Sequence, residues 1–121
     1  MDGTLLTSDK KISFRTRDAI RKAIDAGKIF LIATGRMFIS ARPYAESLDL
    51  DVPLVTYNGA LVKGSQSGKV FYEHKMKAET AQEVLKFCKE KGYYLQYYIN
   101  DDVCVEKGNE FSEYYGRIQN I

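Results

Sequence analysis

Three polar segments in the first half of the chain hold side chains suited to phosphate chemistry. Asp2 stands near the N-terminus, the segment Thr34-Gly35-Arg36 follows the apolar residues 29–33, and Asn58 follows residues 53–57. A short hydroxyl and exposed backbone amides at a strand-to-helix turn can cradle a phosphate, and the helix dipole favours the anion. The segment Thr34-Gly35-Arg36 therefore predicts a phosphate-binding loop, in which Gly35 lets the backbone approach the ligand closely.

The elements around these segments follow from hydrophobic periodicity. Ser13 is a good N-cap for a helix over residues 14–26, which ends before Gly27. Residues 29–33 are continuously apolar, which predicts a parallel strand covered on both faces. A second helix is marked by apolar residues at helical spacing, and a second buried strand is predicted over residues 53–57. The apolar helix positions are Phe38, Ala41, Ala45 and Leu48.

This alternation of helices and strands predicts an α/β fold with a Rossmann-like, doubly wound parallel sheet. A crossover helix over 14–26 joins two parallel strands, so a strand is expected before it. Asp2-Gly3-Thr4 is typical of the turn that leaves the carboxyl end of such a strand. We therefore expect the chain to begin just after its own first strand, with an incomplete sheet core.

The pattern changes after Gly59. Residues 60–63 and 69–73 flank a Gly- and Ser-rich segment, which predicts a β-hairpin with a flexible loop over 64–68. A helix from about Lys77 to Gly92 is followed by two strands, with a turn at Asn100-Asp101-Asp102, and by a helix that begins near Asn109. This α+β pattern predicts two partial domains, a core over 1–76 and a second domain over 77–121.

Composition excludes several classes of protein. The chain has 121 residues and a net charge of +2, and its basic residues are interspersed with acids, so nucleic acid is not an expected partner. No apolar run is long enough to cross a membrane. Cys88 and Cys104 lie in apolar patterns without a metal-binding spacing and predict buried, reduced thiols, which indicates a cytoplasmic protein.

Neither the histidine nor the clustered tyrosines indicate a second type of site. His74 is the single histidine and lies in a linker, so we interpret it as structural. The tyrosines at 93, 94, 97 and 98 lie near acidic residues, whereas a stacking platform for nucleic acid needs a basic groove. We expect them to pack the sheet of the second domain.

Three segments together resemble the haloacid dehalogenase-like hydrolase superfamily, in particular its Cof-like phosphatases with a large α/β cap. They are Met1-Asp2-Gly3-Thr4-Leu5-Leu6-Thr7, Ala33-Thr34-Gly35-Arg36 and Tyr57-Asn58-Gly59-Ala60. Their order and their placement at predicted strand ends carry the resemblance over residues 1–60. The later residues resemble the family only in the order of their elements, which implies that the second domain is a partial, inserted α+β cap.

The resemblance implies roles for individual residues. Asp2 matches the second aspartate of the family pattern Asp-x-Asp-Gly-Thr, the general acid/base and a backbone-carbonyl ligand of Mg²⁺. The nucleophilic aspartate would stand immediately before Met1. Thr34 matches the hydroxyl that binds the transferring phosphoryl group, with Gly35 beside it. Arg36 is either a contact to phosphate or leaving group or a solvated surface charge, and Asn58 is either a residue at the rim of the site or a simple turn residue.

The implied function is that of a Mg²⁺-dependent phosphatase acting on small phosphorylated metabolites through an aspartyl-phosphate. The family's remaining catalytic groups follow the cap, so the 121 residues alone are expected to be inactive and the parent protein active. Alternatives are a phosphosugar mutase and a short protein that binds a phosphorylated ligand or a partner without turnover. The sequence does not specify the substrate or the oligomeric state.

Overall fold

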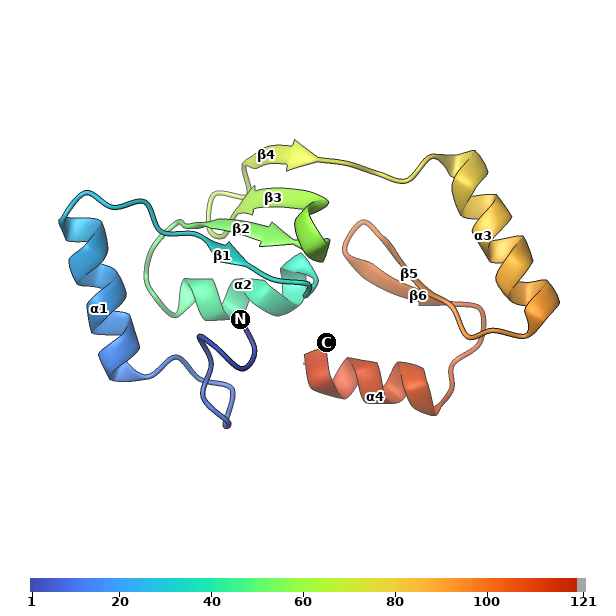
Figure 1. Ribbon diagram of the computed structural model, residues 1–121, viewed down its shortest axis with the longest axis horizontal. Coiled ribbons are helices and arrows are strands. Elements are labelled where there is room, and N and C mark those ends of the chain that lie inside the picture. Colours follow the sequence, from blue (N-terminus) through green and yellow to red (C-terminus); the bar gives the residue numbers. More distant parts are fainter. Residues whose placement is uncertain (120–121) are drawn as a thin grey trace. The chain divides into compact units, whose positions relative to one another are not determined.

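A computed structural model of the chain describes residues 1–119 and divides it into two compact units. The first unit is Met1–Glu73 and the second begins at His74. The first unit contains α1 (Phe14–Asp25), β1 (Ile32–Ala33), α2 (Phe38–Glu46), β2 (Pro53–Thr56), the 3₁₀ turn η1 (Tyr57–Gly59), β3 (Leu61–Gly64) and β4 (Val70–Glu73). The second contains α3 (Ala78–Lys91), β5 (Gln96–Ile99), β6 (Asp102–Val105) and α4 (Glu110–Gln119), all labelled in Figure 1.

The sequence signals for α1 are confirmed. The Ser13 backbone is extended, and its side chain accepts a hydrogen bond from the Thr16 backbone N–H, as an N-cap does. The helix ends at Asp25, one residue before the predicted end, because Ala26 leaves the helical conformation ahead of Gly27.

The first unit is built on a four-stranded sheet in the order β1-β2-β3-β4. β1 pairs in parallel with β2, with Ile32 opposite Leu54, whereas the β2–β3 and β3–β4 pairs are antiparallel. The parallel pair is joined through α2, as in a βαβ unit, and the hairpin β3–β4 extends the sheet on the far side of β2. Loops that leave β1 and β2 therefore emerge at one edge of the sheet.

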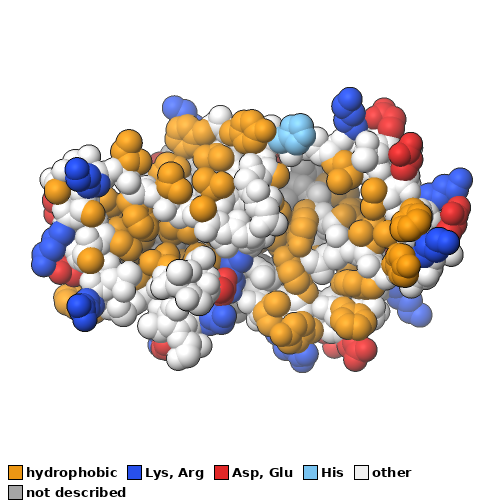
Figure 2. Space-filling model, in the orientation of Figure 1, with side chains coloured by type: hydrophobic (Ala, Val, Ile, Leu, Met, Phe, Trp, Pro, Cys, Tyr) orange, Lys and Arg blue, Asp and Glu red, His pale blue; other side chains and the backbone are white. Residues whose placement is uncertain are grey.

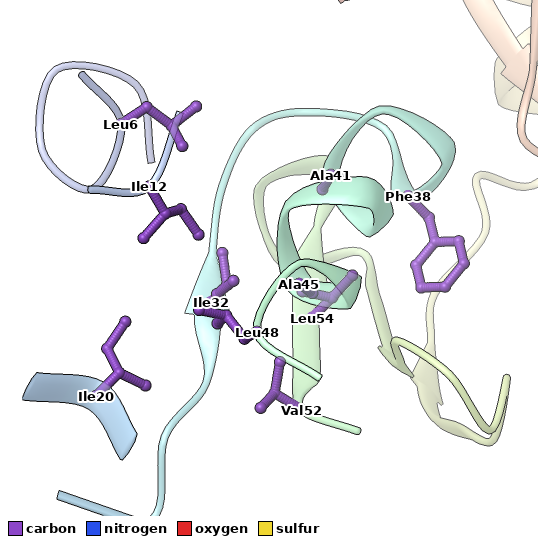
Figure 3. Close-up of a cluster of buried hydrophobic side chains, with 10 residues drawn as sticks. All are labelled: Leu6, Ile12, Ile20, Ile32, Phe38, Ala41, Ala45, Leu48, Val52 and Leu54. Atoms are coloured by element: carbon purple, nitrogen blue, oxygen red, sulfur yellow. The ribbon is translucent and has the colours of Figure 1, made fainter. Parts of the chain in front are cut away.

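One hydrophobic cluster lies between this sheet and its helices (Figure 3). Ile32 and Leu54 are partners in the β1–β2 register and are both buried, so they define the covered face. α1 contributes Ile20 and α2 contributes Ala41 and Ala45 to the same cluster. Because the two alanines are small and fully buried, α2 can approach β2 closely.

The prediction of a strand over 29–33, buried on both faces, is wrong for the residues that the structure describes. β1 contains only Ile32 and Ala33, and the Ile29 and Leu31 side chains are 91% and 49% exposed. Among the described residues β1 pairs with β2 alone, and both helices of the unit pack against the face that carries Ile32. The opposite face of β1 is consequently left open.

The hairpin β3–β4 is confirmed, but its loop is held more firmly than its composition indicates. The Ser65 hydroxyl is buried, accepts a hydrogen bond from the Val52 N–H at 3.0 Å and donates one to the Leu50 carbonyl at 3.2 Å. The Asp51 carboxylate accepts from the N–H groups of Gln66 and Ser67. These bonds tie the loop to the segment that enters β2, so the expectation of a loose loop is not met.

The second unit follows its sequence signals closely. α3 ends at Lys91, and its C-cap Gly92 is left-handed with φ 67° and closes the helix through its N–H. Asn100 and Asp101 are both left-handed, as a tight hairpin turn between β5 and β6 requires. The Asn109 side chain accepts from the N–H groups of Phe111 and Ser112 and so caps α4.

Large apolar side chains are exposed on both units, and several groups of them are visible on the face shown in Figure 2. Cys88 and Cys104 are free thiols, as predicted, but they are only half-buried, so the prediction that they are buried is wrong. None of the helices within residues 1–119 is long and apolar enough to cross a membrane.

Because β1 lies at the edge of the described sheet and the exposed apolar residues Ile29 and Leu31 directly precede it, we predict that the 121-residue chain self-associates when expressed alone. Lysine on an edge strand opposes intermolecular pairing. The double substitution Ile29→Lys and Leu31→Lys should therefore shift the chain towards smaller species in analytical ultracentrifugation. Phe14→Lys removes an equally exposed apolar side chain from α1 and should have less effect. A wild-type chain that sediments as a folded monomer would refute this prediction.

Candidate active site

The two loops predicted to hold phosphate-binding groups lie next to each other at the carboxyl ends of β1 and β2. The Thr34 N–H donates to the Val55 carbonyl at 2.9 Å, which continues the parallel ladder past the end of β1. The Tyr57 N–H donates to the Arg36 carbonyl at 3.0 Å and so joins the loop after β2 to the loop after β1. The edge where open α/β sheets place their ligands is therefore built from both segments.

Asp2 is joined to this edge by a bidentate ion pair with Arg36. Arg36 Nε donates to Asp2 Oδ2 at 2.7 Å and Nη2 donates to Oδ1 at 2.8 Å. Lys10 Nζ also donates to Asp2 Oδ1, at 2.9 Å. The turn that carries Asp2 is closed by the N–H groups of Leu5 and Leu6, which donate to the Met1 carbonyl. Since Leu6 is buried in the core, the turn is anchored to the unit.

The guanidinium of Arg36 is held from α2. Its side chain is only 6% exposed, Nη1 donates to Ser40 Oγ at 2.9 Å, and the group lies 5.5 Å from the centre of the Tyr44 ring. Ser40 and Tyr44 lie four residues apart on one face of α2, and Arg36, which precedes the helix, extends its guanidinium along that face. The alternative interpretation of Arg36 as a solvated surface charge is therefore wrong.

These contacts determine the charge of Asp2. The hydrogen bonds from Arg36, assisted by those from Lys10, hold the pKa of the Asp2 carboxyl well below its usual range, although partial burial opposes this shift. Asp2 is consequently ionised at neutral pH. In this arrangement it can accept hydrogen bonds or a proton, and it can donate a proton only after its carboxyl group has been protonated.

Thr34 directly follows β1, and its hydroxyl is hydrogen-bonded to the backbone of its own loop. Thr34 is half-buried, and its Oγ1 accepts a hydrogen bond from the Arg36 N–H at 3.1 Å. A hydroxyl that accepts in this way keeps its own proton available for donation. Gly35 is exposed and carries the next backbone N–H, at the start of the segment that leads into α2.

Asn58 lies against Gly35. A Cβ atom at position 35 would be 2.8 Å from Asn58 Oδ1, closer than real Cβ contacts come. Tyr57 and Asn58 are both left-handed, with φ 51° and 55°, a conformation that costs a non-glycine residue of order 1–2 kcal/mol. Asn58 is an exposed turn residue whose side chain lies beside the predicted phosphate loop.

The described residues do not by themselves form a Mg²⁺ site. Within residues 1–119, no three His, Cys, Asp or Glu side chains are grouped so that they could hold a metal ion. Mg²⁺ prefers octahedral oxygen coordination that includes carboxylates, and Asp2 is occupied by two cationic partners.

Sequence reasoning missed three residues of this network: Lys10, Ser40 and Tyr44. The helical spacing of Ser40 and Tyr44 after Arg36 is a usable signal once Arg36 is placed inside the fold. Lys10 offers no such signal, since it reaches Asp2 from a turn in which its own backbone is left-handed, with φ 58°.

Comparison with known proteins assigns the class that this fold and site define. A family model described as haloacid dehalogenase-like hydrolase matches residues 1–120, and the chain belongs to this family. The resemblance to its Cof-like phosphatases and the predicted α/β, Rossmann-like fold class are thereby confirmed.

Individual proteins similar to this chain are named as phosphatases. The Bacillus subtilis 168 protein 5-amino-6-(5-phospho-D-ribitylamino)uracil phosphatase YwtE is 30% identical over 101 residues, which cover 84% of this chain and 34% of that protein. Pyridoxal phosphate phosphatase YbhA of Escherichia coli K12 is 27% identical over 106 residues, 88% of this chain and 39% of that protein.

A solved structure extends the similarity to the whole fold. The crystal structure of TM0651 from Thermotoga maritima matches with a TM-score of 0.83 at 31% identity, over 99% of this chain and 45% of that one. The chain thus spans about a third of the length of YwtE and less than half of that of TM0651.

The ion pair of Asp2 should make stability depend on pH. Because the pKa of Asp2 is lower in the folded state than in the unfolded state, its contribution is present above the unfolded pKa, near 4, and is lost as the pH falls further. In urea unfolding of the full-length protein at several pH values from 7 to 3, Asp2→Asn should show a shallower acid loss than wild type. Asp25→Asn, which alters an exposed carboxylate at the end of α1, is the matched control and should follow wild type. Equal slopes for wild type and Asp2→Asn would contradict this prediction.

Proposed function

We propose that the full-length protein is a phosphatase that hydrolyses phosphate monoesters of small metabolites. The observation that carries this proposal is the Asp2–Arg36 ion pair beside the Thr34-Gly35 loop, at the edge where β1 and β2 end. Relatives whose names specify phosphatases of a ribitylaminouracil phosphate and of pyridoxal phosphate support the same chemistry.

The phosphoryl group would bind at the loop after β1. The Thr34 hydroxyl and the Gly35 N–H are its direct donors in this proposal, and the N-terminus of α2 adds a favourable dipole. Arg36 brings positive charge to the adjoining position, although its Nε, Nη1 and Nη2 groups already bind Asp2 and Ser40. Its effect on a bound phosphate is then mainly electrostatic.

Asp2 would act as the general acid and then as the general base. A phosphate dianion beside Asp2 raises the pKa of its carboxyl by repulsion, which favours the protonated form that can serve the leaving group. In the family pattern the attacking aspartate stands two positions before Asp2. That carboxylate displaces the leaving oxygen from phosphorus as Asp2 protonates it, and Asp2 next takes a proton from the water that hydrolyses the aspartyl-phosphate.

The proposal includes dependence of the phosphatase on Mg²⁺. The backbone carbonyl of Asp2 would be one ligand, and further ligands are needed beyond those of residues 1–119. When bound, the ion would neutralise charge on the phosphoryl group. Loss of turnover in EDTA, restored by added Mg²⁺, would support this part separately.

We propose that the second unit is a partial cap that influences substrate choice. Asn100 and Asp101 form the tip of the β5–β6 hairpin with Asp102. A polar hairpin tip on a cap can contact the leaving group and exclude water from a site.

A binding role without turnover is the alternative that a specific observation favours. The Asp2 carboxylate is paired with both Arg36 and Lys10, which makes it a weak base. Calorimetry with a phosphorylated ligand and a parallel assay for released phosphate separate the two roles: saturable binding without release would favour the binding protein. A phosphosugar mutase would instead transfer phosphate to an added acceptor sugar.

For the phosphatase itself, we expect the full-length protein to release phosphate from part of a panel of sugar phosphates, nucleotides and pyridoxal phosphate. Asp2→Asn should lower kcat by about 10²–10⁴-fold, the usual contribution of a general acid/base. Asp25→Asn, in α1, should keep the wild-type kcat. Absence of release across the whole panel in the presence of Mg²⁺ would rule the proposal out.

For the cap, we expect Asp101→Ala combined with Asp102→Ala to change the relative kcat/KM values across that panel. Turnover itself should persist, because the phosphate loop is unaltered. Glu79→Ala, an exposed acidic residue in the first turn of α3, is the control for the loss of negative charge from this unit. An unchanged substrate profile in the double variant would remove the hairpin tip from the proposed binding surface.

A further inference from the structure

The loop after β2 contains two adjacent non-glycine residues in the left-handed conformation, Tyr57 and Asn58. For a bulky residue such as Tyr57 this conformation is a genuine outlier. Such backbone persists where the surrounding structure holds it, and it is concentrated at functional sites. The contacts of this loop must therefore hold Tyr57 and Asn58 in the left-handed conformation.

Two contacts join this loop to the phosphate loop. The Tyr57 N–H donates to the Arg36 carbonyl at 3.0 Å. The Asn58 side chain lies directly beside the position that a Cβ of residue 35 would take, with Oδ1 at 2.8 Å from it. Any residue other than glycine at position 35 would displace Asn58. The two loops can therefore lie this close together because Gly35 has no Cβ atom.

The segment Thr34-Gly35-Arg36 also determines the orientation of the Asp2 carboxylate. Arg36 accepts the Tyr57 hydrogen bond through its backbone and holds Asp2 through two side-chain nitrogens, at 2.7 and 2.8 Å. A planar, bidentate pair fixes direction as well as distance, so a shift of the Arg36 backbone reorients the carboxylate. A continuous set of contacts thus runs from Asn58 through Gly35 and Arg36 to Asp2.

We infer that Asn58 is a positioning residue. Its amide, seated against Gly35, fixes the backbone of Thr34-Gly35-Arg36 and, through Arg36, the orientation of the Asp2 carboxylate. This role differs from that of a substrate ligand, because Asn58 acts on the loop and not on the phosphate. The inference rests on the proposed phosphatase function and deepens it.

The first test is Asn58→Gly in the full-length protein. Glycine adopts φ 55° without strain, so the melting temperature should remain close to that of wild type. Because misplaced catalytic groups lower turnover, kcat should fall by about 10-fold or more while KM changes by less than about 2-fold. Asp49→Gly makes the same kind of change at another exposed left-handed residue of the first unit, φ 57°, and should keep wild-type kinetics.

Gly35→Ala displaces Asn58 from the opposite side. The new methyl group meets the far end of an exposed side chain, which can rotate away at little cost in stability. Gly35→Ala should therefore reproduce the loss of kcat. The kcat of the double variant should be no lower than that of the less active single variant, because both substitutions remove the same contact between Asn58 and Gly35.

Several outcomes would overturn the inference: wild-type kcat in Asn58→Gly, losses in the double variant that multiply, or a change in KM that exceeds the change in kcat. If wild type releases no phosphate at all, the proposed function fails, and hydrogen exchange still tests the contacts. The Tyr57 amide should exchange faster in Asn58→Gly and Gly35→Ala than in wild type. Unchanged protection of that amide would refute the positioning role independently of turnover.

Discussion

A guanidinium that is almost entirely removed from water requires a partner of opposite charge, and the first unit is arranged around that requirement. Arg36 obtains it from Asp2, 34 positions earlier in the chain, while Ser40 and Tyr44 hold the group from α2. One side chain thereby joins the N-terminal turn, the end of β1 and the following helix. An unpaired buried charge is costly, so these three segments are expected to keep their arrangement together.

The parallel register of β1 and β2 also determines where the loops of the candidate site lie. Because Ala33 is opposite Val55, the strands end almost together and their loops meet at one edge. The small residues Ala41 and Ala45 allow α2 to pack closely against β2, and this packing fixes where the helix begins. Polar groups from distant parts of the sequence thus come together as a result of strand pairing and helix packing.

Local signals predicted most of the elements. The cap at Ser13, the left-handed stop at Gly92 and the β3–β4 hairpin each follow from short-range chemistry. The failures involve long-range contacts. The apolar residues 29–33 indicate burial, but how much of a strand is covered depends on its neighbours, and only the Ile32 side of β1 is covered in the described residues. Likewise, the motifs identified Asp2 and Arg36 separately, whereas no spacing rule could pair them or bring Asn58 to Gly35.

The loop between β3 and β4 shows how composition can mislead an engineer. Its Gly, Ser and Gln residues resemble a flexible linker, the usual choice for inserting a tag or opening a new chain terminus. Here Ser65 is buried and accepts a hydrogen bond from the Val52 N–H, while the Asp51 carboxylate accepts one from the Gln66 N–H. An insertion at this place would break the connection that holds the start of β2. The first turn of α3 is exposed at residues 78–80, which makes it a less disruptive place to insert a peptide.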